Sequence, residues 1–140
     1  MLLSQIKPLN EAGYDTPGEV VYHKDIGFPD DLVMPRGFSP VITLDYGGHA
    51  RFEAMSDKYG KLNLPHRVDV RTDGDIIEVG AIDNVCCKLV FRMSYDAKKD
   101  IVLVIKVPTG FVKTVWANEK NDQHRTLDRS RYGNPNARRA

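Results

Sequence analysis

Three β-branched and aromatic runs joined by short turns constrain this chain more than any other feature. The runs cover Lys88 to Tyr95, Ile101 to Val107 and Phe111 to Asn118. The turn-forming cluster Asp96-Ala97-Lys98-Lys99-Asp100 separates the first two runs, and Pro108-Thr109-Gly110 separates the last two. Connections this short place consecutive strands side by side and antiparallel. The sequence therefore predicts a β-meander.

Alternation along these runs divides the predicted sheet into two faces, because successive side chains of a strand point to opposite sides. One set on the first strand is apolar and is predicted to face the core: Leu89, Phe91, Met93 and Tyr95. The opposite set contains Lys88, Val90, Arg92 and Ser94. Neither set of the last strand is purely apolar, so one face of the sheet is a candidate working surface.

One helix is predicted ahead of the meander. Phe52, Met55 and Tyr59 recur at helical spacing, and Gly60 after them is a usual C-cap. The sequence therefore predicts a helix over residues 49–59 that begins at a histidine and follows two glycines.

These elements predict an α+β fold, with one main helix packed on a four-stranded antiparallel sheet. Shorter strands are expected at 19–23, 41–46, 67–70 and 76–82. The expected organisation is an irregular N-terminal segment laid on the core, a single core domain and a flexible tail, over residues 1–40, 41–132 and 133–140 respectively.

The charge balance argues against a generally basic protein. The chain has 140 residues, enough for a single domain with a real core, and a formal charge of +1. From Glu119 onward there are six Lys or Arg residues and three acids, which leaves +3 on this segment and −2 on the rest. A local basic patch is therefore expected near the C-terminus, but not a generally basic protein.

Cysteine usage and the first residues of the chain indicate a cytoplasmic protein. Cys86 and Cys87 are adjacent, a spacing that suits neither a spaced-pair metal site nor an unstrained disulfide, so reduced thiols are expected. The apolar run at the N-terminus is too short for a signal peptide, and no stretch is long enough to span a bilayer. No cofactor and no metal are expected.

The basic C-terminal segment has the composition of a nucleic-acid contact. A guanidinium group can donate two parallel hydrogen bonds to phosphate oxygens, and aromatic rings stack on bases. The candidates for RNA binding are Trp116, Arg125, Arg129, Arg131 and Tyr132. The alternative is a solvated extension in which the arginines pair with Asp122 and Asp128.

His49 and Glu53 are four residues apart and therefore share one face of the predicted helix. A positive helix N-terminus beside His49 also favours an anion. The pair is either a proton-transfer site or an incidental pair at an exposed helix start.

A helix headed by histidine, an antiparallel sheet and a last strand Val-Lys-Thr-Val-Trp-Ala-Asn, followed by His-Arg-Thr-Leu-Asp-Arg-Ser-Arg-Tyr, together resemble the barnase, colicin and RelE-like ribonuclease superfamily. The likeness covers roughly residues 43–132 and is greatest to the toxin domains of polymorphic toxin systems and phage genomes. It implies metal-independent RNA cleavage, in which the 2′-hydroxyl attacks the adjacent phosphate.

The resemblance also implies roles for single residues. It makes His49 a candidate base or acid, with His124 or Tyr132 as the second proton-transfer group. It gives phosphate-charge stabilisation and orientation to residues of the sheet: Lys88, Arg92, Thr114 and Asn118. The implied partners are RNA, such as transfer RNA or ribosome-associated RNA, and a cognate inhibitor protein, with no membrane. The alternative is a non-catalytic accessory factor of phage or mobile-element origin that binds RNA or a protein.

Overall fold

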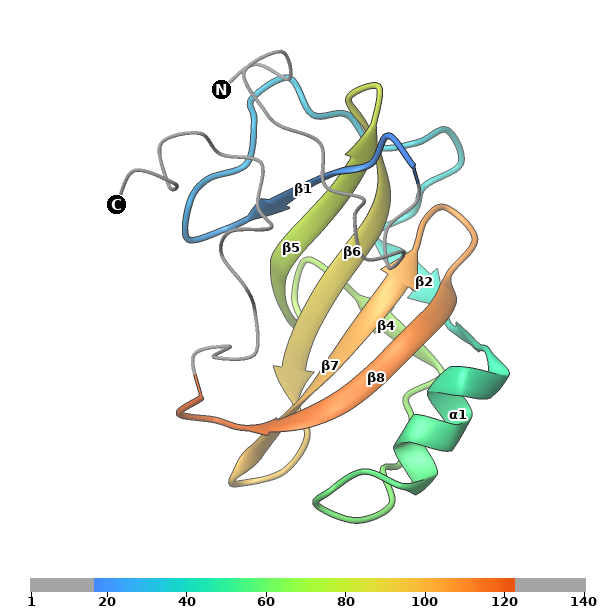
Figure 1. Cartoon of the computed structure of the whole chain (residues 1–140), viewed down its shortest axis with the longest axis vertical. Coiled ribbons are helices and arrows are strands. Elements are labelled where there is room, and N and C mark those ends of the chain that lie inside the picture. Colours follow the sequence, from blue (N-terminus) through green and yellow to red (C-terminus); the bar gives the residue numbers. More distant parts are fainter. Residues whose placement is uncertain (1–16, 123–140) are drawn as a thin grey trace.

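The computed structural model describes residues 17–122, which form a twisted six-stranded sheet with a short helix at one edge (Figure 1). The elements in chain order are β1 (Val20–His23), β2 (Val41–Thr43), β3 (Asp45–Tyr46), α1 (Gly48–Met55), β4 (Arg67–Asp69), β5 (Gly74–Ile82), β6 (Val85–Ser94), β7 (Lys99–Lys106) and β8 (Phe111–Glu119). The strand order in the large sheet is β1-β5-β6-β7-β8-β3, and β2 pairs with β4 in a separate sheet. Among the strand pairs of residues 17–122, β3 with β8 is parallel and the others are antiparallel, and an isolated parallel bridge joins Val33 to Val85.

The predicted meander is present as β6, β7 and β8, with β5 joined to it ahead of β6. Each of these strands pairs antiparallel with the next. The strand predicted at 19–23 is also present, as β1, and it pairs with β5.

The predicted four-stranded antiparallel sheet with one main helix is wrong. The sheet has six strands and mixed direction, and the described chain is mostly strand with one short helix. The error has a physical source at Leu44, which is buried and donates its backbone N–H to His66 O over 2.9 Å. Residues on its two sides pair with different strands, β4 and β8, so the segment predicted as one strand is divided between two sheets.

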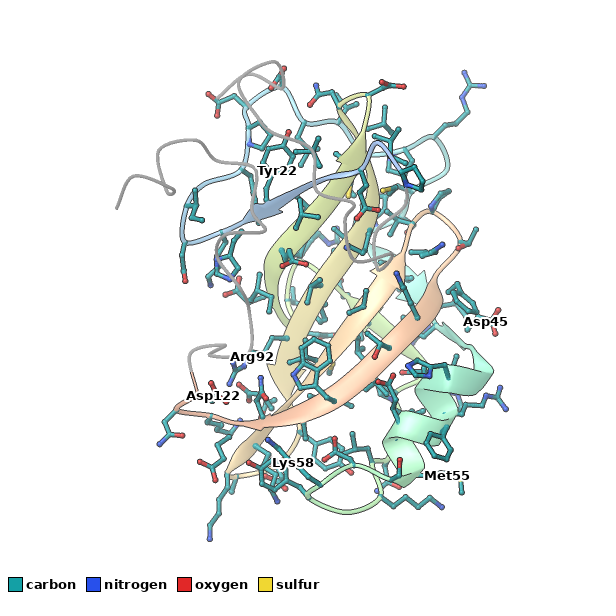
Figure 2. All side chains as sticks on the ribbon, viewed as in Figure 1. Tyr22, Asp45, Met55, Lys58, Arg92 and Asp122 are labelled. Atoms are coloured by element: carbon teal, nitrogen blue, oxygen red, sulfur yellow. The ribbon has the colours of Figure 1, made fainter. Side chains whose placement is uncertain are left out.

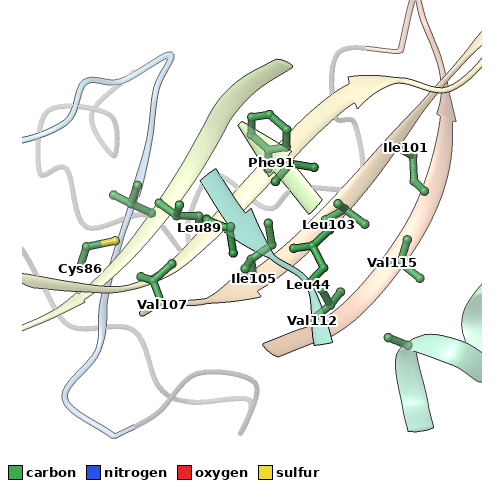
Figure 3. Close-up of a cluster of buried hydrophobic side chains, with 14 of the residues drawn as sticks. Leu44, Cys86, Leu89, Phe91, Ile101, Leu103, Ile105, Val107, Val112 and Val115 are labelled. Atoms are coloured by element: carbon green, nitrogen blue, oxygen red, sulfur yellow. The ribbon is translucent and has the colours of Figure 1, made fainter. Parts of the chain in front are cut away.

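The main core lies on one face of the large sheet, where β6, β7, β8, the small sheet and α1 meet (Figure 3). The predicted core face of β6 is confirmed: Leu89 and Phe91 are buried there, and Met93 and Tyr95 pack against the same cluster. Ile101, Leu103 and Ile105 of β7 join the cluster, as do Val112, Val115 and Ala117 of β8.

The opposite face of the sheet contains a second, smaller apolar cluster. Val90, Val102 and Val104 are buried there with Ile77, and the partly buried Trp116 packs against them. The register places Val90 opposite Val104, and Val104 opposite Thr114. The centre of the face predicted as a working surface is therefore buried, and polar groups lie only around it.

Helix α1 is shorter than predicted and ends at Met55, before Tyr59 and Gly60. The Ser56 hydroxyl donates to Phe52 O over 2.8 Å, a local bond that competes with continuation of the helix. The residues that bury α1 against the sheet are Ala50 and Ala54, whereas Phe52 and Met55 are 68% and 69% exposed. Within residues 17–122, no helix is long and apolar enough to cross a membrane.

Candidate functional site

The site is built where α1 covers an open strand edge. Strand β3 pairs with β8 only at Phe111 and Val112, so the backbone N–H groups farther along β8 lack a neighbouring strand on that side. Two carboxylates of α1 and the turn after it take that place. Glu53 Oε1 accepts the Val115 N–H over 3.2 Å, and Asp57 Oδ1 accepts the Ala117 N–H over 3.1 Å. The helix thereby satisfies an edge that would otherwise expose unpaired donors.

A glycine sets how closely the helix approaches β8. A Cβ at Gly47 would lie 2.6 Å from the Phe111 ring, well inside van der Waals contact. A side chain at this position would require the Phe111 ring to move, so glycine lets the N-terminus of α1 lie against the ring. Gly47 thus permits the close approach of a β8 side chain, whereas a Cβ at Gly48 would meet nothing within 4 Å.

His49, Glu53 and Thr114 form a connected polar row at this edge. His49 Nε2 lies 3.5 Å from Glu53 Oε2, and the Thr114 hydroxyl donates to Glu53 Oε1. The Glu53 carboxylate is therefore held from one side by β8 and faces the imidazole on the other. The His49 side chain is 73% exposed and that of Glu53 is 29% exposed, so solvent and ligands reach the imidazole.

The N-terminus of α1 adds a favourable field for an anion. Gly47 caps the helix without a side-chain hydrogen bond, and no acidic residue lies in the first turn. The helix macrodipole places partial positive charge at this end, and a phosphate beside His49 would meet it.

Lys88, predicted to stabilise phosphate charge, lies in a buried ion pair instead. Lys88 Nζ is 2.9 Å from Glu19 Oε2, with side-chain exposures of 8% and 4%. The Cys87 thiol donates to the other carboxylate oxygen, Glu19 Oε1, over 3.3 Å. A Cβ at Gly80 would lie 2.7 Å from this carboxylate, so glycine on β5 makes room for the pair. The Lys88 ammonium group is therefore held in an ion pair inside the protein, with Glu19 as its partner.

Arg92, the second predicted phosphate ligand, ties the ends of three strands together. Its Nε donates to Asp100 Oδ2 over 2.8 Å, and its two terminal nitrogens donate to Asp122 O over 2.7 Å and Glu119 O over 2.8 Å. Figure 2 shows Arg92 and Asp122 close together at one end of the sheet, away from α1. Arg92 lies on the same face as Thr114 but fixes the end of β8.

Asn118 and Trp116 are likewise part of the packed sheet. Asn118 is 2% exposed. With its amide oxygen turned toward the indole, it accepts the Trp116 Nε1–H over 3.2 Å. The tryptophan also packs on the second apolar cluster. Of the predicted sheet residues, only Thr114 is brought to His49, and it acts through Glu53.

The Asp100 contacts predict a specific acid sensitivity. Burial alone raises the pKa of Asp100, but hydrogen bonds from Lys120 and Arg92 outweigh it and hold the pKa below its ordinary value. A lowered folded-state pKa stabilises the fold above the unfolded-state pKa, about 3.9, and this stabilisation is lost as pH falls through the folded-state pKa. We expect Asp100→Asn to cost about 1.5–3 kcal/mol at pH 7 and to flatten the loss of stability below about pH 4.

Urea unfolding measured from pH 7 downward checks this expectation. Asp30→Asn, at an exposed loop position, is the matched control for the loss of one carboxylate. An acid limb as steep in Asp100→Asn as in the wild type would contradict the assigned role of the Arg92 and Lys120 contacts.

Both cysteines are free, as expected for reduced thiols. Burial raises the pKa of Cys86 to about 11 and that of Cys87 to about 12, with the Glu19 carboxylate adding to the second shift. Cys87 lies at a register shift of β6, since Gly80 pairs with Lys88 and Ala81 with Cys86. The thiols are therefore packing groups and stay protonated at neutral pH.

The remaining predicted residues lie outside the described part of the chain: His124, Arg125, Arg129, Arg131, Tyr132 and the tail 133–140. Sequence reasoning paired Glu53 with His49 but gave it no contact with β8, and it left Asp57 out of the site. The signal for Glu53 was its spacing from His49. Nothing local indicates that Asp57 reaches β8, because its partner Ala117 is distant in sequence.

Within residues 17–122, no group of three or more His, Cys, Asp or Glu side chains is arranged to hold a metal ion.

Comparison with known proteins identifies no relative of this chain. No protein-family model, no curated protein and no solved structure matches the chain.

Proposed function

We propose that this chain is a metal-independent endoribonuclease with the His49 imidazole as its proton-transfer group. The observation that carries the proposal is the row of His49, Glu53 and Thr114 at the α1–β8 edge. An exposed imidazole oriented by a carboxylate, itself held by a third group, is the arrangement used for general acid–base work. The resemblance to the ribonuclease superfamily, which assigns a histidine at the start of this helix, supports the same choice.

The reaction begins with a proton transfer. His49 Nε2, as the neutral base, takes the proton of the RNA 2′-hydroxyl, and the 2′-oxygen forms a bond to the adjacent phosphorus. The bond from phosphorus to the 5′-oxygen breaks, leaving a 2′,3′-cyclic phosphate and a 5′-oxygen that takes a proton. The resemblance assigns that second proton to His124 or Tyr132. Glu53 faces the imidazolium that forms at His49.

The phosphate contacts in this proposal differ from those implied by the resemblance. Lys88 and Arg92 are held by internal partners, so the field at the N-terminus of α1 takes the role of favouring the phosphate. Thr114 donates to Glu53 and serves as a positioning residue.

A second candidate function is non-catalytic RNA or protein binding. The commitment of Lys88 and Arg92 to internal contacts favours it, because these are two of the cations that the resemblance assigns to transition-state charge.

Incubation of the purified chain with total transfer RNA in EDTA separates the two functions. We expect discrete fragments on a denaturing gel, and the same fragments when Mg²⁺ replaces EDTA. Arg36→Ala, an exposed substitution on the loop between β1 and β2, is the matched control and should cleave like the wild type. Intact RNA at high protein excess would overturn the general ribonuclease, and a shifted band in the matching native gel would then favour the binding function.

A further inference from the structure

A cleft lies between α1 and the 61–66 loop. It has a volume of about 480 Å³. Arg51, Ala54 and Met55 line it on the helix side, and residues of the 61–66 loop form the other wall. Figure 2 shows two of its lining residues, Asp45 and Met55, near opposite ends of α1. His49 is not part of this lining, so the cleft is distinct from the proposed cleavage site.

The floor of the cleft is apolar. Leu44, Ala54 and Leu62 line it and are 9%, 2% and 4% exposed. Small-molecule sites combine such an apolar lining with a few placed polar groups, in volumes of about 300–1,000 Å³. Met55 also lines the cleft and is 69% exposed, so a flat ring laid beside it would cover apolar surface that water now touches.

Two cations, Arg51 and Lys61, are among the lining residues. Arg51, Lys61 and His66 are exposed and line the cleft, and Asp45 is the one acid among the described lining residues. Arg51 and Lys61 together with Asp45 give the lining a formal charge of +1. Guanidinium and ammonium groups in a cleft lining are suited to a phosphate group.

The walls are held in place by hydrogen bonds. The Tyr46 hydroxyl donates to Pro65 O over 2.7 Å, and Arg51 Nε donates to Tyr46 O over 3.1 Å. Burial raises the pKa of Tyr46, so this hydroxyl keeps the proton that it donates. Across the cleft, Leu62 N–H donates to Ala54 O over 2.8 Å. A ligand would therefore meet a preformed cleft, which lowers the entropic cost of binding.

We propose that this cleft binds a nucleoside monophosphate unit, with the base on the floor and the phosphate at Arg51 and Lys61. The Asn63 side chain, which also lines the cleft, supplies an amide for the edge of a base. The proposal goes beyond the cleavage reaction and does not require it. The same chemistry is offered by a free mononucleotide and by one nucleotide of an RNA strand.

Calorimetric titration of the whole chain with adenosine monophosphate tests the proposal. We expect saturable binding, with adenosine and inorganic phosphate each at least about tenfold weaker because each lacks one half of the contacts. Lys61→Glu and Arg51→Gln should each weaken binding by about tenfold. Lys58→Glu, an exposed lysine outside the lining, is the matched control and should bind like the wild type.

Two further measurements make the outcome decisive. A 2′-O-methylated hexanucleotide that displaces the mononucleotide would place the bound unit in an RNA strand, and failure to displace it would indicate a free mononucleotide. His49→Ala should bind the mononucleotide normally, which separates this cleft from the cleavage site. Absence of saturable binding at millimolar mononucleotide, or unchanged affinity in the well-folded Lys61→Glu chain, would overturn the proposal.

Discussion

Replacing Lys88 by methionine is expected to lower the free energy of unfolding by about 3–5 kcal/mol. The substitution removes the cation that lies 2.9 Å from Glu19 Oε2 and leaves a carboxylate that is 4% exposed. An uncompensated buried charge costs far more than the pair itself contributes. Because a domain of this size is stable by about 5–15 kcal/mol, a large part of the stability depends on this contact.

A double substitution distinguishes the pair from general damage. Glu19→Gln combined with Lys88→Met removes both charges, and we expect it to recover most of the loss. Lys24→Met breaks the exposed ion pair with Asp75 and is the matched control, with an expected cost of about 1 kcal/mol or less. Equilibrium urea unfolding measures all three. A Lys88→Met protein as stable as the wild type, or a double variant no better than the single one, would refute the assigned role.

Replacing His49 by alanine is expected to lower the rate of RNA cleavage by about 10²–10⁴-fold. The imidazole is the exposed end of the row through Glu53 to Thr114. Because its side chain is 73% exposed, its removal should leave the fold intact, and thermal unfolding of the variant should match that of the wild type. A stable variant with undiminished cleavage would show that proton transfer occurs elsewhere.

Glu53→Gln tests the positioning role separately. Glutamine keeps an acceptor for Val115 and Thr114 but removes the negative charge that faces His49. We expect cleavage to fall by about tenfold, because the negative charge that faces the imidazolium formed in the reaction is lost. A purely structural role would instead lower the thermal stability of the variant in proportion to the loss of cleavage.

Local patterning predicted the parts of this fold that local rules govern. Alternation identified the core face that contains Leu89 and Phe91, and short turns identified the meander. The spacing of His49 and Glu53 predicted that they share a helix face, and they lie at contact distance. These features depend on residues that are close in sequence.

The failures concern partners that are distant in sequence. Lys88 has the residue type and the strand position expected of a phosphate ligand. Its ammonium group instead forms an ion pair with Glu19, which precedes β1 in the chain. Arg92 is held by Asp100 and by carbonyls near the end of β8. The irregular pairing of β7 with β8 could not be predicted from the sequence either. The register shift between Val104 and Ile105 determines which face of the sheet each β8 side chain occupies.

The most direct test of the proposed chemistry compares an RNA oligonucleotide with the same strand carrying 2′-deoxyribose at the cleaved position, both in EDTA. We predict a fragment ending in a 2′,3′-cyclic phosphate from the first strand and no cleavage of the second, because the attacking hydroxyl is missing. Fragments that carry a 5′-phosphate, or equal cleavage of both strands, would contradict it.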